Sequence, residues 1–143
     1  MRRAIQYCLT IAAVASLASN PVRAEDQGQE TLERLYEEAN NCSSMIALGQ
    51  IVSETSELPP VLEADRDIFD AWLSELSTRY GRIMHAVGHA AGRSKSEIRS
   101  DWENNVRDFA KENQYQGREG VIKLFDKVKA CGDELSIPEP GTK

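Results

Sequence analysis

Apolar residues recur at alternating steps of three and four along most of the chain from Gln29 onward, without the two-residue alternation of a β-strand. Such spacing places the apolar side chains along one side of an α-helix, so each segment has one face to bury. A chain of 143 residues made of such segments has to cover these faces by packing helix against helix around one core. The sequence therefore predicts an all-α, single-domain fold.

Helix-breaking residues divide the first half of this pattern into two segments. We expect a first helix at about Gln29–Thr55, because Pro59 and Pro60 cannot continue it. A second helix is expected at about Val61–Ala91, with Gly92 as its C-terminal stop. The second helix is predicted to be the longest, with an apolar face of Phe69, Trp72, Leu73, Leu76, Tyr80, Ile83, Met84, Val87 and Ala91.

The second half of the pattern predicts two more helices. The tetrapeptide SKSE is a capping box, in which Ser94 is the N-cap and Glu97 stands three residues later. The segment QYQGREG, with Gly117 in it, separates the third helix from the fourth, and GDELSIPEPGTK is expected to be a frayed tail. The inward faces are Ile98, Trp102, Val106 and Phe109 on the third helix, and Val121, Leu124, Phe125, Val128 and Cys131 on the fourth.

The first 24 residues have the pattern of a secretory signal peptide. Two arginines precede an apolar run that is shorter than the ~20 residues needed to span a bilayer. Val22 and Ala24 then occupy the −3 and −1 positions of a cleavage site. We interpret Met1–Ala24 as a removed signal peptide and Glu25–Lys143 as the helical bundle domain. The protein is thus expected to be periplasmic or otherwise exported.

The charge of the chain limits the classes of partner. Removal of Arg2, Arg3 and Arg23 with the leader would take the formal charge from −6 to −9. Nucleic acids and anionic lipid surfaces attract basic proteins, so neither is expected as a partner, and no membrane association is expected after cleavage. An acidic surface is compatible with a cationic protein or peptide. A homodimer is an open alternative.

Two cysteines remain after Cys8 is removed with the leader, and both lie on apolar helix faces. In an oxidising compartment, such a pair is most often a structural disulfide, and the absence of a CxxC spacing disfavours a redox-active pair. One continuous third and fourth helix would leave Cys131 about 25–30 Å from Cys42 along the bundle axis, whereas a reversal at Gly117 brings it within about 10 Å of the level of Cys42. The Cys42–Cys131 bridge therefore predicts an up-down bundle of four helices, with the first and last helices tied together.

The only histidines of the chain, His85 and His89, lie four residues apart in the stretch RIMHAVGHAAGR. On a helical wheel they share a face opposite the apolar stripe of the second helix. Ligands to a cofactor inside the bundle would lie on the inner stripe, so no haem or other cofactor is expected. A metal ion bound by both histidines would need further ligands, and a solvated helix face is the alternative interpretation.

Small residues follow one another along the same helix at Ser74, Gly81, Gly88 and Gly92. Glycine inside a helix costs about 1 kcal/mol, so these positions call for a physical reason. Close packing against a neighbouring helix is one reason. The other is a contact surface for a partner, a second copy of the chain or a flat ligand.

The sequence contains none of the short motifs that indicate catalysis, such as GxSxG, SxxK or HExxH. We therefore expect a non-enzymatic interaction protein that binds a protein or peptide. A carrier of a metal or small ligand that uses the His85 and His89 face is the second hypothesis, and an enzyme is the third.

Overall fold

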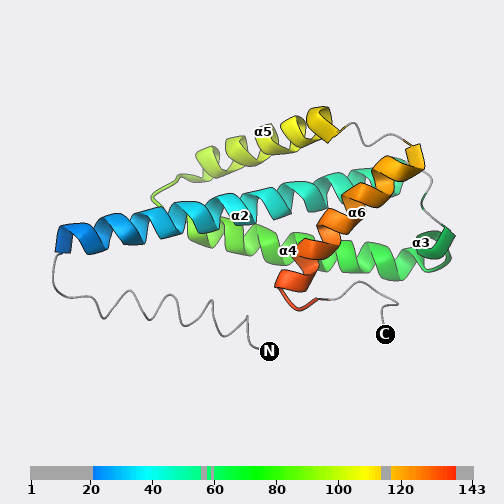
Figure 1. Cartoon of the computed structure of the whole chain (residues 1–143), viewed down its shortest axis with the longest axis horizontal. Helices are drawn as coiled ribbons and strands as arrows, with labels where there is room; N and C mark the ends of the chain where they lie inside the picture. The colour runs from blue at the N-terminus through cyan, green and yellow to red at the C-terminus, as the bar shows by residue number, and fades with distance from the viewer. Residues whose placement is uncertain (1–20, 56–57, 59, 114–116, 138–143) are drawn as a thin grey trace.

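The computed structural model describes residues 21–55, 58, 60–113 and 117–137, and this part of the chain contains helices and no strands (Figure 1). Successive long helices run in opposite directions, as an up-down bundle requires. The predicted all-α fold is confirmed. The helices are α2 (Pro21–Thr55), α3 (Pro60–Ala64), α4 (Arg66–Ala90), α5 (Lys95–Asn113) and α6 (Gly117–Glu134).

The central element is α2, which contacts α4, α5 and α6 (Figure 1). For this reason α2 is buried on more than the single stripe that the sequence predicts. Tyr36, Ile46 and Leu48, which do not lie on a single side of a helix, are all buried. Three small polar side chains of α2, Ser43, Ser44 and Ser53, are also buried, and the Ser53 hydroxyl donates to Asp70 on α4 at 2.7 Å.

The buried apolar side chains form two clusters at different levels of the bundle. The larger cluster joins α2, α4 and α6, and Phe69 and Phe125 meet there edge to face with ring centroids 4.9 Å apart. The smaller cluster joins α2, α4 and α5 and consists of Tyr36, Ala39, Met84 and Ile98. Of the predicted inward face of α5, only Ile98 is fully buried. This helix is thus attached to the bundle by a narrower apolar contact than α4 or α6.

The predicted disulfide is present between Cys42 on α2 and Cys131 on α6, with their Cα atoms 5.8 Å apart. Both cysteines belong to the larger apolar cluster. The alternative of one continuous third and fourth helix is wrong, because α6 begins at Gly117 and returns along α2 (Figure 1). Gly117 has φ +70°, a backbone conformation that favours glycine.

The sequence predicts one continuous helix from Val61, but the structure has two helices there, α3 and α4. The five-residue helix α3 ends at Ala64, and Asp65 leaves the helical conformation with φ −123° and ψ 36°. The Asp65 carbonyl accepts the first hydrogen bonds of α4, from the amides of Ile68 and Phe69. The Arg66 guanidinium donates to the Ser53 carbonyl at 2.9 Å, so the start of α4 is tied to the end of α2. The chain therefore bends sharply at Asp65, and the apolar pattern gives no sign of that bend.

Helix α2 begins at Pro21, eight residues before the predicted start at Gln29. It has 35 residues against 25 in α4, so the prediction that the second helix is the longest is wrong. The sequence estimate relied on an apolar stripe, whereas residues 26–30 of α2 carry no large apolar side chain and are mostly exposed. The cleavage-site residues Val22 and Ala24 fall in its first turn, and residues 1–20 of the predicted signal peptide lie outside the described residues. No helix in the described part of the chain is long and apolar enough to cross a membrane.

The predicted frayed tail is wrong for its first six residues. Helix α6 continues to Glu134, and the Ile137 amide then donates to the Gly132 carbonyl at 2.9 Å, with Ser136 at φ 58°. The Trp72 indole donates to the Ile137 carbonyl at 3.2 Å, which fixes this end of the chain against α4. A Cβ at position 132 would lie 2.8 Å from that same carbonyl oxygen, so glycine is needed there. Residues 138–143 of the predicted tail lie outside the described residues.

Candidate functional site

The junction between α4 and α5 is built from two local motifs that the sequence predicts. Gly92 has φ +85°, and the amides of Gly92 and Arg93 donate to the carbonyls of His89 and Gly88, which is a Schellman motif. The capping box follows at once, since Ser94 Oγ accepts from the Glu97 amide and Glu97 accepts from the Ser94 amide. The Ser94 hydroxyl also donates to the Glu97 carboxylate at 2.7 Å, and this bond, followed by the one from the Ser94 amide, lowers the pKa of Glu97.

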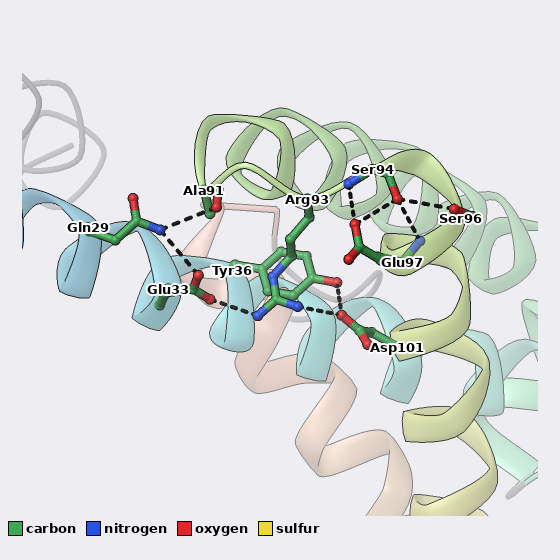
Figure 2. Close-up of polar contacts among 9 residues, drawn as sticks. All are labelled: Gln29, Glu33, Tyr36, Ala91, Arg93, Ser94, Ser96, Glu97 and Asp101. Carbon is green, nitrogen blue, oxygen red and sulfur yellow. Dashed lines mark hydrogen bonds and ion pairs between the residues drawn. The ribbon is translucent and has the colours of Figure 1, made fainter.

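The two motifs leave Arg93 at the junction, where its side chain joins three helices (Figure 2). Its guanidinium forms ion pairs of 2.8 Å with Glu33 on α2 and with Asp101 on α5. It also lies over the Tyr36 ring, 4.4 Å from the centroid, in a cation–π contact. The Tyr36 hydroxyl donates to the same Asp101 oxygen at 2.9 Å. We call Glu33, Tyr36, Arg93 and Asp101 the Arg93 cluster.

The electrostatics of the Arg93 cluster follow from these contacts. The hydrogen bond to Glu33 raises the pKa of Arg93, so the guanidinium stays charged. Burial, followed by the hydrogen bond to Asp101, raises the pKa of Tyr36. The phenol is therefore a proton donor that holds α5 to α2, and it is not poised to act as a base near neutral pH.

A shallow groove runs between α2 and α5 from the Arg93 cluster toward the middle of both helices. Two of its carboxylates, Glu37 and Asp108, are exposed and form no ion pair among the described residues. The only guanidinium in the groove, that of Arg93, is already shared between two other carboxylates. The groove is therefore acidic. Its lining residues are Tyr36, Glu37, Asn40, Asn41, Arg93, Asp101, Asn104, Asn105 and Asp108.

Four asparagines lie in this groove, two from each helix, and they differ in their bonding. Asn105 donates to Asn41 across the groove at 2.9 Å. Asn40 is only 8% exposed. The one hydrogen bond that its side chain makes among the described residues is from the Ser44 hydroxyl to Asn40 Oδ1 at 3.5 Å, which is longer than usual. A buried amide normally makes several hydrogen bonds, so the Asn40 side chain retains unused capacity at the floor of the groove.

The predicted metal ligands lie elsewhere, on the outer face of α4. His85 and His89 are exposed on successive turns, with ring centroids 6.2 Å apart. His89 Nδ1 lies 3.0 Å from the Arg93 carbonyl oxygen. Among the described residues there is no group of three or more His, Cys, Asp or Glu side chains that could hold a metal ion. The two histidines are therefore brought together without a third protein ligand.

The predicted small-residue surface is divided between three environments. Gly88 is buried, and a Cβ added there would lie 2.7 Å from Ile98 Cδ1, so its missing side chain admits α5. Gly92 is the cap residue, while Gly81 has no neighbouring atom within 4 Å of an added Cβ and Ser74 is exposed. At Gly88 the close approach is made within the protein and not with a partner.

A second depression lies where α2, α3 and α4 meet, lined in part by Glu54, Leu58 and Pro60. Of its three ionic side chains, Arg66 and Glu63 are paired with each other at 2.6 Å, which leaves Glu54 as the one carboxylate of this lining outside an ion pair among the described residues. The groove between α2 and α5 has two such carboxylates, Glu37 and Asp108, and is therefore the better site for a cationic partner.

The sequence did not single out the Arg93 cluster or the groove asparagines. Arg93 follows a predicted stop and precedes a predicted cap, so its backbone position was foreseeable. Its partner Glu33 is 60 residues away, and nothing in the spacing indicates which of the many acidic residues it meets.

The comparisons with known proteins found no family model, no curated protein and no solved structure that matches this chain.

Proposed function

We propose that this chain is an exported, non-enzymatic binding protein whose α2–α5 groove receives a positively charged segment of a protein or peptide partner. The observation that carries the proposal is the lining of that groove. It combines the two unpaired carboxylates of Glu37 and Asp108 with the partly unbonded amide of Asn40.

The chemistry of the lining suits an extended polypeptide. An asparagine side chain offers both a donor and an acceptor, so it can bond the N–H and C=O groups of a peptide backbone. The carboxylates of Glu37 and Asp108 attract a lysine or arginine side chain of the bound segment. The negative charge of the whole chain adds a long-range attraction that accelerates association and weakens with salt.

The lining also supports binding in preference to catalysis. None of the lining residues is a serine, cysteine or histidine, so this groove holds no nucleophile and base pair of the Ser-His or Cys-His kind. The tyrosine hydroxyl and the arginine are used to hold α2, α4 and α5 together.

Export rests on the leader pattern of Met1–Ala24, and the disulfide supports it. A buried Cys42–Cys131 bridge is typical of a protein that matures in an oxidising compartment.

Fluorescence anisotropy with a labelled Lys-Gly repeat peptide tests the proposal, with a Glu-Gly repeat peptide of equal length for comparison. We expect the Lys-Gly peptide to bind and the Glu-Gly peptide not to bind. The double variant Glu37→Gln/Asp108→Asn should weaken binding of the Lys-Gly peptide by about tenfold, because both carboxylates of the groove are then neutral.

The matched control is Glu119→Gln/Asp126→Asn on α6, which makes the same change of charge on exposed positions outside the groove. It should weaken binding by less than about twofold at ~0.15 M salt, where charges more than about 8 Å apart are largely screened. If both double variants weaken binding equally, the attraction comes from net charge alone and the groove is not the site.

A further inference from the structure

The outer face of α4 carries a second, independent feature, the pair His85 and His89. We propose that these two imidazoles form a surface chelating site for a divalent transition-metal ion of the Cu²⁺ or Zn²⁺ class. The geometry that points to it is an exposed i, i+4 histidine pair in which the surrounding structure already fixes one ring.

The fixed ring is that of His89. Its Nδ1 lies 3.0 Å from the carbonyl oxygen of Arg93, and a carbonyl can only accept a hydrogen bond. In the neutral imidazole the proton is therefore on Nδ1, and the lone pair is on Nε2. Metal-binding histidines commonly donate their second nitrogen to a backbone carbonyl in this way, which orients the ring and makes it a better ligand.

The carbonyl that orients His89 is itself held in place. It belongs to Arg93, the residue that follows the Schellman glycine and whose side chain is bound by Glu33, Asp101 and Tyr36 (Figure 2). The ion pairs therefore fix the backbone that sets the His89 ring. The His89 ring is therefore already ordered in the metal-free protein, so metal binding does not have to order it.

The second ligand, His85, lies one turn earlier on the same face. Its ring centroid is 6.2 Å from that of His89, with the ring planes 35° apart. His85 is exposed and makes no hydrogen bond among the described residues, so it is free to rotate between side-chain rotamers. Such a rotation would turn a ring nitrogen toward the ion that His89 holds.

The residues around the pair favour an accessible site. Ala86 and Ala90 are exposed and small, so they leave the ion open to water. Two imidazole nitrogens with water in the other positions suit Cu²⁺ best and Zn²⁺ next, whereas Ca²⁺ and Mg²⁺ prefer oxygen ligands.

Titration of the metal-free, disulfide-bonded protein with Cu²⁺ tests this site. Calorimetry measures the binding, and electron paramagnetic resonance identifies the ligand atoms. We expect one saturable site per chain and a spectrum with nitrogen hyperfine structure from two imidazoles. His85→Asn and His89→Asn should each weaken binding by at least about tenfold, and each should remove one nitrogen from the spectrum. Both side chains are exposed, so both variants should retain the helical circular dichroism of the parent.

A relocated pair is the matched control. The double variant His89→Asn/Ala90→His keeps two histidines and the same charge but places them five residues apart, about 140° around the helix. It should bind Cu²⁺ as weakly as the single variants. Binding as tight as that of the parent, or a parent that shows no saturable site, would overturn the proposal.

Discussion

The single residue on which the packing of α5 most depends is Gly88. A Cβ there would lie 2.7 Å from Ile98 Cδ1, 2.9 Å from Ile98 Cγ1 and 3.0 Å from Tyr36 Cε2. Ile98 and Tyr36 are themselves buried, so neither can move aside without disturbing the smaller apolar cluster. Gly81, seven residues earlier in the same helix, has open space around it. Gly81 and Gly88 lie on the same side of α4, but only Gly88 is needed for close packing against a neighbouring helix.

We predict that Gly88→Ala lowers the free energy of unfolding by about 1–3 kcal/mol, because overpacking forces Ile98 or α5 to shift. Gly81→Ala is the matched control, and it should raise the free energy of unfolding by up to about 1 kcal/mol, because alanine is the better helix former. Urea unfolding followed by circular dichroism measures both. Equal effects of the two substitutions would contradict this account.

At the scale of the element, α5 is held to the bundle mainly at its first half. Ile98 is its fully buried residue, and Asp101 receives bonds from Arg93 and Tyr36. Further along, Trp102, Val106 and Phe109 are only half-buried. Binding of a partner in the α2–α5 groove would therefore take place beside the helix with the narrowest apolar contact.

The Tyr36 hydroxyl gives this attachment a dependence on pH. Its pKa is raised in the folded protein above its ordinary value of about 10, so the folded state holds the proton more tightly than the unfolded state. The resulting stability is complete below about pH 10 and is lost as the pH rises toward the folded pKa. We predict that Tyr36→Phe lowers the free energy of unfolding by about 1–2 kcal/mol at neutral pH.

Above about pH 10 the parent should lose stability faster than Tyr36→Phe, because phenylalanine has no proton to release. Urea unfolding of both proteins at intervals from neutral to alkaline pH measures the difference. The gap between the two curves should narrow as the pH rises. Parallel curves would show that neither burial nor the hydrogen bond to Asp101 raises the pKa of Tyr36 in the folded protein.

For the whole molecule, the bridge between Cys42 and Cys131 ties α2 to α6 across 89 residues of chain. It limits how far the unfolded chain can expand, and it adds to the apolar contact of the larger cluster. The number of free thiols also tests the predicted export, because Cys8 lies in the predicted leader and is lost if that leader is removed.

We predict that the protein obtained by expression of the full sequence has no free thiol when titrated in denaturant. One thiol per chain would show that Cys8, and with it the leader, is retained. Two thiols would show that the bridge is absent. Replacement of both bridge cysteines by alanine should lower the free energy of unfolding by about 2–4 kcal/mol, measured by urea unfolding against the parent.

Features that depend only on residues close together in the chain could be predicted from the amino-acid sequence. The helical period, the stop at Gly92, the capping box at Ser94 and the reversal at Gly117 are all confirmed. Each rests on backbone angles and hydrogen bonds that span only a few residues, so a local pattern is enough to predict it. The Cys42–Cys131 pairing was predictable because Cys8 lies in the predicted leader, which leaves only two cysteines in the rest of the chain.

Which helix faces pack against each other could not be predicted from the sequence and is known from the fold. Burial of α2 on several sides, the closeness of Glu33 and Arg93, and the groove with Asn40 at its floor depend on how α5 lies against α2. Helical periodicity shows that a side chain faces inward but does not show which helix it meets. A polar cluster between residues 60 or more apart, such as Glu33 with Arg93 and Tyr36 with Asp101, therefore leaves no pattern in the sequence.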